Sequence, residues 1–351
     1  MKIGILTFHR AYNYGAVLQC YALQQVLQEL GSEAYVLDYQ QKYIDAKYRT
    51  IDFNILRKYI LKPKTFLGYL RRYPKRYKIS KFFKNFQKKR LHLLKFNKEN
   101  LNACNAFIIG SDQMWGIHCT GGIDKIYFGE FPHKASSPIY GYAISTNIDS
   151  IKSIGKEKLY NYAKSFKTLS FREKNIKSRV EELTNLTCRT DVDPTLLTRK
   201  ETWNSVINKK WEKENYIVLY QVRYPKNREI LYNKAKALSQ KLNCKIIDLS
   251  TYKYSPEDFV SLIKYSRCVI TSSFHAVIFS LIFERPLFAV KLNDGHDDRY
   301  VNILEDLGAT DLLYDLDFLP EMKEFKYESI AHRIEKLRSE SINYLLDICK
   351  K

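Results

Sequence analysis

Apolar residues recur along this chain in two alternating patterns, short continuous runs and longer stretches with helical spacing. Together they predict a repeated strand–helix fold. The segment 266–299 shows the alternation most compactly: 268–271 predicts a buried strand, 276–283 a buried helix and 287–290 the next strand. The polar turn before the helix lies where parallel α/β sheets bind ligands, outside the carboxyl end of a strand.

The same alternation divides the chain into two halves of similar size. Strands are predicted at 2–8, 33–39, 106–110, 139–145, 216–221 and 245–249, with a loop at 11–16 and helices at 17–30, 151–165, 228–242, 256–265 and 325–350. We therefore expect an α/β fold of two Rossmann-like domains facing a cleft. The expected domains are 1–195 and 196–325, followed by a terminal helix at 326–351 that can pack back on the N-terminal domain.

Residues 41–100 interrupt this rhythm and carry most of the charge. They hold 19 Lys and Arg residues against three acids, or +16 of the formal net charge of +20. Basic residues interleaved with aromatic and aliphatic ones are typical of helices on anionic membrane surfaces. Nucleic-acid phosphates are a less favoured ligand, and a solvated helical hairpin is the alternative without a ligand. We expect a basic helical insertion in the N-terminal domain.

Composition narrows the class of protein further. The 351-residue chain has no apolar run near the ~20 residues that span a bilayer. Its seven cysteines are odd in number and scattered, without a CxxC pair. Disulfides and a zinc site are therefore not expected, and a reducing cytoplasm is the expected compartment.

Polar residues follow two of the predicted strands. His275 lies in the turn after 268–271, and imidazole is suited to proton transfer near neutral pH; a histidine satisfied inside the helix cap is the alternative. Asp112, Gln113 and Trp115 follow another strand. A carboxylate for hydroxyls and an indole face for stacking suit a sugar, whereas an N-cap aspartate is the alternative.

Two more loops carry candidate ligand-binding residues. Asn13 and Gly15 lie after the first strand, where a substrate would meet the sheet, although a simple turn explains them equally. Arg172 follows a strand that ends near 171. A guanidinium suits bidentate recognition of phosphate or carboxylate, with an ion pair to a nearby acid as the alternative.

Five stretches occur in a recognisable order. They are NYGAVLQCYALQQVLQELG (13–31), FIIGSDQMW (107–115), SFREKNI (170–176), VDPTLL (192–197) and SSFHAVIFSLIFERP (272–286), with Arg299 downstream. With this order and spacing the chain resembles the polysaccharide pyruvyl transferase family. The resemblance implies a glycosyltransferase-B-like fold whose cleft binds phosphoenolpyruvate. It also implies transfer of the pyruvyl group to a sugar, commonly as a cyclic ketal on two hydroxyls.

The resemblance implies roles for individual residues as well. The family's donor-binding arginine falls on Arg172, and its histidine falls on His275, which would act as the acid. A further basic donor ligand of some members falls on Gly295, so Arg299 or Lys291 would supply that charge.

The remaining roles divide between donor and acceptor. Backbone N–H groups near Ser273 and Phe274, at the start of the predicted helix, would complete the donor site in the C-terminal domain. In the N-terminal domain, Asp112 would orient or deprotonate the acceptor hydroxyl. The residues expected to contact the acceptor are Asn13, Gly15, Gln113 and Trp115. No cofactor or metal is expected, phosphoenolpyruvate being a co-substrate.

The basic segment suggests where the acceptor is held. We expect a sugar on a polyprenyl diphosphate, with the protein peripheral at the inner face of a bacterial membrane. A nucleotide-sugar glycosyltransferase of the same architecture is the alternative enzyme. A non-catalytic module that binds glycolipid or nucleic acid is the alternative from another class.

Overall fold

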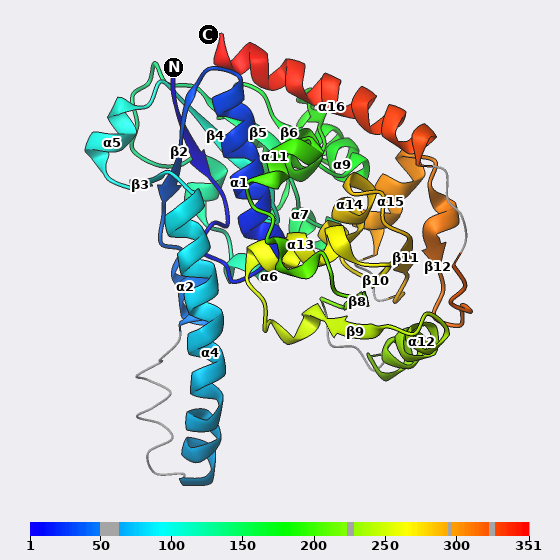
Figure 1. The fold of residues 1–351 in the computed structure, drawn as a ribbon. Helices are drawn as coiled ribbons and strands as arrows, with labels where there is room; N and C mark the ends of the chain where they lie inside the picture. The colour runs from blue at the N-terminus through cyan, green and yellow to red at the C-terminus, as the bar shows by residue number, and fades with distance from the viewer. Residues whose placement is uncertain (50–62, 223–227, 294–296, 323–326, 351) are drawn as a thin grey trace. The chain divides into compact units, whose positions relative to one another are not determined.

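The computed structural model of the protein describes residues 1–49, 63–222, 228–293, 297–322 and 327–350. The chain divides into two compact units. Unit 1 contains Met1–Leu197 together with Ser341–Lys351, and unit 2 contains Thr198–Glu340 (Figure 1). Each unit has its own sheet of parallel strands.

The sheet of unit 1 has the strand order β3-β2-β1-β4-β5-β6-β7. Its strands are β1 (Lys2–Leu6), β2 (Glu33–Asp38), β3 (Leu93–Lys95), β4 (Ala106–Asp112), β5 (Ile139–Ile144), β6 (Ser170–Phe171) and β7 (Arg189–Thr190). Because β1 pairs in parallel with both β2 and β4, the strand order reverses between β1 and β4. The carboxyl ends of these two strands form the topological switch point, where open α/β sheets bind ligands.

Helices connect the strands of unit 1. They are α1 (Tyr14–Glu29), α2 (Lys42–Tyr48), α4 (Pro63–Arg90), α5 (Lys98–Ala103), α6 (Ile117–Thr120), α7 (Ile148–Ile154), α8 (Lys156–Ala163), α9 (Lys174–Thr184) and α10 (Pro194–Leu197), with a 3₁₀ turn η1 (Lys125–Phe128). α1 is buried along most of its length, because apolar residues occur on nearly all of its faces. The buried amide nitrogen of Gln19 donates to Thr7 Oγ1 at 2.7 Å, which fixes the helix against the end of β1.

The sheet of unit 2 has the order β12-β11-β10-β8-β9. Its strands are β8 (Tyr216–Tyr220), β9 (Lys245–Asp248), β10 (Val269–Thr271), β11 (Leu287–Val290) and β12 (Leu313–Tyr314). Its helices are α11 (Lys200–Asn204), α12 (Arg228–Lys241), α13 (Pro256–Tyr265), α14 (Phe274–Ile282) and α15 (Asp298–Asp306), with 3₁₀ turns η2 (Lys209–Trp211), η3 (Leu249–Thr251) and η4 (Thr310–Leu312). The order reverses between β8 and β10, so the switch point of this sheet lies at their carboxyl ends.

The prediction of Rossmann-like units built on parallel sheets is confirmed. The units divide between Leu197 and Thr198, against an expected boundary at 195/196. The last helix, α16 (Glu328–Cys349), begins in unit 2 and ends in unit 1. Its final turns contact unit 1 through Ser341, whose hydroxyl accepts from Val192 N at 3.2 Å, and through Tyr344, whose hydroxyl donates to the Gly141 carbonyl at 3.1 Å.

Two local predictions are wrong. The single helix expected at 151–165 is divided into α7 and α8 by Gly155, whose φ of 81° belongs to a region that side chains other than glycine rarely adopt. The loop expected at 11–16 is shorter, because α1 begins at Tyr14 with Asn13 as its N-cap, accepting from Ala16 N at 3.2 Å. Gly15 therefore lies buried in the first turn of α1 rather than in a loop.

The expected basic insertion at 41–100 is helical only in part. Its described residues form the helices α2, α4 and α5, but Leu93–Lys95 are the strand β3, which pairs with β2 in the sheet of unit 1. Residues 50–62 lie outside the described residues. Figure 1 shows the N-terminal half of α4 extending away from the sheet of unit 1. The C-terminal half is anchored, since the buried ring of Phe83 stacks on Tyr12 and Tyr14 at 5.4 and 5.5 Å between centroids. Among the helices of the described residues, none combines the length and apolar character needed to cross a membrane.

Candidate functional site

His275 lies in the first turn of α14, directly outside the carboxyl end of β10. Thr271, the last residue of β10, organises the turn. Its hydroxyl donates to the Tyr220 carbonyl at 2.6 Å and accepts from Ser273 N at 3.0 Å. The mostly buried imidazole meets the ring of Phe274 edge-on, with centroids 5.1 Å apart. The expected donor residues 273–275 thus lie together at the switch point of unit 2.

Two polar side chains at the same strand ends were missed from the sequence. Gln221 follows β8 and is 3% exposed, yet neither its amide oxygen nor its amide nitrogen has a hydrogen-bond partner among the described residues. The buried hydroxyl of Ser272, after β10, is in the same condition. β8 pairs directly with β10, and Ser272 N donates to the Tyr220 carbonyl at 3.3 Å, so the two residues end neighbouring strands.

These two unsatisfied groups are candidates for contact with a ligand. A buried polar group without a partner costs on the order of 1–3 kcal/mol, and native proteins keep few of them. The Gln221 amide nitrogen and the Ser272 hydroxyl need hydrogen-bond acceptors, and the Gln221 amide oxygen needs a donor. A ligand with acceptor oxygens could satisfy the first two, and a donor on the ligand or a bound water could satisfy the third. The signal was present in the sequence, because Gln221 is the polar last residue of an otherwise apolar predicted strand.

The loop after β11 carries the expected basic residues of unit 2. Asp297 closes this loop by accepting two backbone N–H groups at 2.9 and 2.7 Å. Lys291 is ion-paired with Asp315 at 3.1 Å, so part of its charge is neutralised. Arg299 lies in the first turn of α15 and is partly exposed. Gly295 lies outside the described residues.

In unit 1, the expected acceptor residues Asn13, Asp112 and Gln113 lie at the carboxyl ends of the adjacent strands β1 and β4. The two strand ends are in contact, since the Thr7 hydroxyl donates to the Ser111 carbonyl at 2.9 Å. Asp112 and Gln113 are both partly exposed, so their polar groups are accessible at this switch point.

The backbone around Asp112 is unusual. Asp112 has a φ of 85°, a conformation uncommon outside glycine and costing of order 1–3 kcal/mol, and its carboxylate accepts from Gln113 N at 2.8 Å. Gly110, just before it, has a φ of 146°, and a Cβ there would lie 1.8 Å from the carbonyl oxygen of Tyr142. Only glycine fits there, because β4 lies close against β5 at this point.

Arg172 is enclosed by polar partners of its own unit. Its side chain is 5% exposed and donates to Asp193 at 2.7 Å, to Glu173 at 3.2 Å and to the Ser145 hydroxyl at 2.8 Å. Burial by itself lowers the pKa of the guanidinium, but the carboxylates of Glu173 and Asp193 outweigh it and raise that pKa above its ordinary value. The structure therefore shows the ion pair that the sequence left open as the alternative for Arg172.

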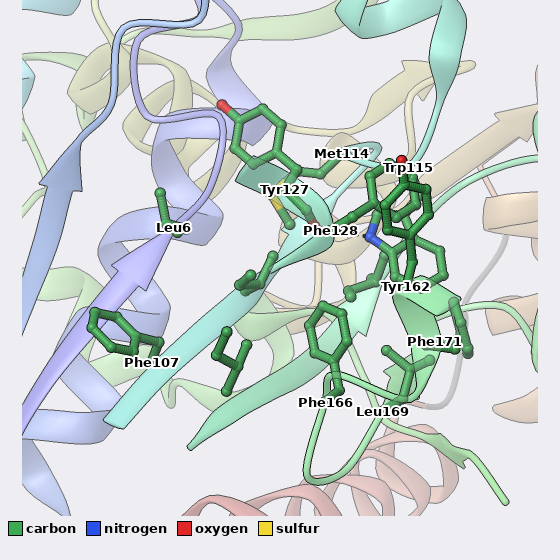
Figure 2. Close-up of a cluster of buried hydrophobic side chains, with 14 of the residues drawn as sticks. Leu6, Phe107, Met114, Trp115, Tyr127, Phe128, Tyr162, Phe166, Leu169 and Phe171 are labelled. Carbon is green, nitrogen blue, oxygen red and sulfur yellow. Dashed lines mark hydrogen bonds between the residues drawn. The ribbon is translucent and has the colours of Figure 1, made fainter. Parts of the chain in front are cut away.

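The expectation that Trp115 offers a face to a sugar is wrong for this structure. Trp115 is fully buried in the core of unit 1, where its ring stacks on Phe128 at 4.6 Å and meets Phe171 edge-on (Figure 2). Its indole nitrogen donates to the Tyr127 carbonyl at 3.0 Å. The ring is covered because segments far from it in sequence fold over it, which local sequence does not reveal.

Within the ranges that the structure describes, no group of three His, Cys, Asp or Glu side chains is placed to hold a metal ion. The cysteines of the structure are all free thiols.

Comparison with known proteins gives likenesses to solved structures at low identity. UDP-N-acetylglucosamine 2-epimerase from Rickettsia bellii matches with a TM-score of 0.44 and 11% identity, over 96% of this chain and 87% of that one. The Methanocaldococcus jannaschii UDP-GlcNAc 2-epimerase in complex with UDP-GlcNAc and UDP matches with a TM-score of 0.42 and 12% identity, over 96% of this chain and 92% of that one. The E. coli heptosyltransferase WaaC with ADP matches with a TM-score of 0.40 and 11% identity, over 96% of this chain and 100% of that one.

No curated protein matches the chain by sequence. The family model described as polysaccharide pyruvyl transferase, by contrast, matches residues 13–294, which is most of the chain and includes the loops after β4, β6 and β10. The chain belongs to the polysaccharide pyruvyl transferase family.

Proposed function

We propose that the protein transfers the pyruvyl group of phosphoenolpyruvate onto a pair of sugar hydroxyls, forming a cyclic ketal on a precursor of a surface polysaccharide. Family membership supports pyruvyl transfer to a polysaccharide. The observation that carries the proposal is the pair of buried, unsatisfied side chains Gln221 and Ser272 beside His275.

The chemistry of the donor matches what unit 2 offers at its switch point. Phosphoenolpyruvate presents carboxylate and phosphate oxygens, which would accept from the Gln221 amide and the Ser272 hydroxyl. The N–H groups that open α14 favour an anion at the same place, with Arg299 and Lys291 as the nearby cations. We assign donor recognition first to unit 2, because the guanidinium of Arg172 already serves Asp193 and Glu173.

His275 is proposed as the acid. The electrons of the donor double bond take a proton from the imidazolium, which forms a C–H bond at the methylene carbon and leaves an oxocarbenium-like centre. A bound dianionic phosphate favours the protonated imidazole that this step needs. One sugar hydroxyl then attacks and releases its proton, with Asp112 as the proposed orienting group. Phosphate leaves with the electrons of its C–O bond, and the second hydroxyl attacks and loses its proton to close the ring.

The acceptor is proposed to be carried on a lipid diphosphate, with the protein peripheral at the inner face of the membrane. What supports this is the composition of α4, which holds eleven Lys and Arg residues and no Asp or Glu. Basic residues close to an anionic surface contribute about 1 kcal/mol each.

Thermal unfolding with added ligand tests the donor. Phosphoenolpyruvate is expected to raise the midpoint as its concentration rises, since a ligand that binds only the native state stabilises it by mass action. A nucleotide sugar at the same concentration is expected to leave it in place. The reverse result would support the glycosyltransferase alternative and reject the pyruvyl donor.

Turnover of the His275→Ala variant tests the acid. We expect phosphate release from phosphoenolpyruvate to slow by ~10²–10⁴-fold, as is typical when an acid–base group is lost, with the thermal midpoint retained. His332→Ala, which removes an exposed histidine of α16 in the same unit, is the matched control. Equal rates for the two variants would remove His275 from the mechanism.

A further inference from the structure

One face of α4 changes character along its length. Its residues recur every three or four positions and therefore share one side of the helix. In chain order they are Leu67, Leu70, Tyr73, Tyr77, Lys81, Lys84 and Lys88. The outer end of this graded face is exposed, with Leu67 at 59%, Leu70 at 44% and Tyr77 at 54%. It passes from apolar through aromatic to cationic as it approaches the body of unit 1.

The inner part of the graded face lines a groove of about 890 Å³, which α2 and the β1–α1 loop complete. This volume is within the range of small-molecule sites. Lys81, Lys84 and Lys88 are exposed, and no described carboxylate lies within ion-pair distance of them. The acid on the groove wall, Asp45, is bonded to Arg10 at 3.0 Å.

Among the described residues, no carboxylate compensates the charge of these three lysines. Like charges three or four residues apart on a helix repel and destabilise it. Three lysines spaced in this way, with Arg49 facing the same groove, therefore make a site that an anion with several negative charges would stabilise.

Aromatic side chains lie at the outer side of the lysines. Tyr73 stacks on Tyr77 with ring centroids 6.1 Å apart. Tyr12 and Tyr48, which also line the groove, pack against each other with ring centroids 5.2 Å apart. The Tyr12 hydroxyl is hydrogen-bonded to Ser80 on α4 at 2.9 Å. Tyrosines of this kind offer both an apolar ring and a polar tip to a ligand.

The groove is held in a fixed place beside the strand ends of unit 1. The Gln87 amide donates to the His9 carbonyl at 2.7 Å, which ties α4 to the β1–α1 loop. Arg10 and Tyr12 on the groove wall are within three residues of Asn13, so the chain between them spans at most about 10 Å. A ligand bound in the groove is therefore close to the switch point of unit 1.

We propose that this groove binds the diphosphate of a lipid-linked sugar. The diphosphate contacts Lys81, Lys84 and Lys88, the sugar points toward the β1–α1 loop, and the hydrocarbon runs outward along Leu70 and Leu67. The identity of the sugar acceptor rests on the proposed function, whereas the binding of the diphosphate does not. A nucleic-acid backbone is the poorer match, because it carries no hydrocarbon for the exposed leucines.

Calorimetric titration of the full chain with inorganic pyrophosphate and with farnesyl diphosphate tests the cationic part. The variant K81Q/K84Q/K88Q is expected to lose about 10²-fold in affinity for both probes. The control R72Q/K75Q/K89Q removes the same charge from exposed positions of α4 outside the groove and is expected to bind nearly as the unaltered protein does. Circular dichroism confirms that both variants are folded.

The direction of the lipid is tested by L67S/L70S. This variant is expected to bind farnesyl diphosphate about 3–10-fold more weakly, because apolar contact is lost, and to bind pyrophosphate as the unaltered protein does. A similar loss for both probes would overturn the assigned direction.

Three results would overturn the site itself. The first is equal loss in the two triple variants, which would reduce the effect to net charge. The second is farnesyl monophosphate binding as tightly as the diphosphate. The third is a single-stranded oligonucleotide that binds with steep salt dependence while farnesyl diphosphate does not bind. None of these titrations contains phosphoenolpyruvate, so they succeed or fail independently of the pyruvyl donor.

Discussion

Two groups of buried polar side chains at strand ends, one in each unit, differ in how far their own unit satisfies them. In unit 1 the buried guanidinium of Arg172 donates to Asp193, Glu173 and the Ser145 hydroxyl, so its charge is neutralised inside the protein, although the second carboxylate oxygen of Glu173 has no hydrogen-bond partner among the described residues. In unit 2 the buried side chains of Gln221 and Ser272 have no partner among the described residues. A charged residue after a strand can therefore serve the fold alone, whereas unused hydrogen-bonding capacity at a switch point indicates a place for a ligand.

The largest effect that this comparison predicts is on Arg172. The substitution Arg172→Ala is expected to lower the free energy of unfolding by about 3–5 kcal/mol, because it leaves two buried carboxylates uncompensated. Denaturation by urea measures it. The control Arg179→Ala breaks an exposed pair with Glu182 on α9 and is expected to cost at most about 1 kcal/mol. If the two variants proved equally stable while donor affinity fell for Arg172→Ala, the arginine would belong to the ligand and the contrast between the units would disappear.

The substitution Trp115→Phe is expected to give a smaller loss of stability, also in unit 1. The ring face is largely kept, but the Tyr127 carbonyl loses its indole donor in a buried place, at a cost of about 1–3 kcal/mol. Thermal unfolding should show the loss while the affinity for any sugar acceptor is retained. A variant as stable as the unaltered protein but with weakened acceptor binding would return Trp115 to the site.

In unit 2 we expect the opposite change in the free energy of unfolding when a buried polar residue is replaced. Gln221→Leu replaces an unsatisfied amide with an apolar group of similar size, so the free energy of unfolding should hold or rise, by up to about 1–3 kcal/mol. The thermal shift with phosphoenolpyruvate should shrink at the same time. Gln240→Leu, on an exposed position of α12, is the control for both readouts. A destabilised Gln221→Leu protein would mean that the amide is satisfied after all.

The smallest effect concerns Asp38, at the end of β2. The hydrogen bond from His9, with that from Arg10, lowers the pKa of Asp38 from 3.8 to about 2, against the opposing effect of burial. Since the carboxylate is held charged in the native state, its contribution is complete above pH 4 and is lost as the pH falls toward 2. The stability difference between the unaltered protein and Asp38→Asn should therefore hold from pH 6 to about pH 4 and shrink as the pH falls further toward 2. A difference that grows on acidification would contradict this pairing.

The repeated strand–helix units could be predicted because their signals are local. The strand, turn and helix from β10 to α14 follow from β-branched, polar and apolar runs. Ser255 is the N-cap of α13 and forms a capping box with Asp258. For the graded face of α4, the sequence showed only that basic and aromatic residues are mixed. Which of them share the side that faces the groove could be seen only in the structure.

The environments of individual side chains could not be predicted in the same way. Trp115 is covered by Phe128 and Phe171, and Arg172 is neutralised by Asp193, partners brought close by the sheet rather than by the sequence. The family pattern points to positions such as 172 and 275. It does not say at which of them the side chain already has its hydrogen-bond and charge partners within the protein.

The division of α16 between the units has a consequence for how the protein is made. Unit 1 buries Leu345 and Ile348, which the ribosome adds only after the whole of unit 2. Domains of a growing chain tend to fold in the order in which they emerge. Unit 1 can therefore complete its core only after residues beyond 340 have been translated, so a nascent chain stalled before residue 341 should be more open to proteases and chaperones than one that includes this helix end.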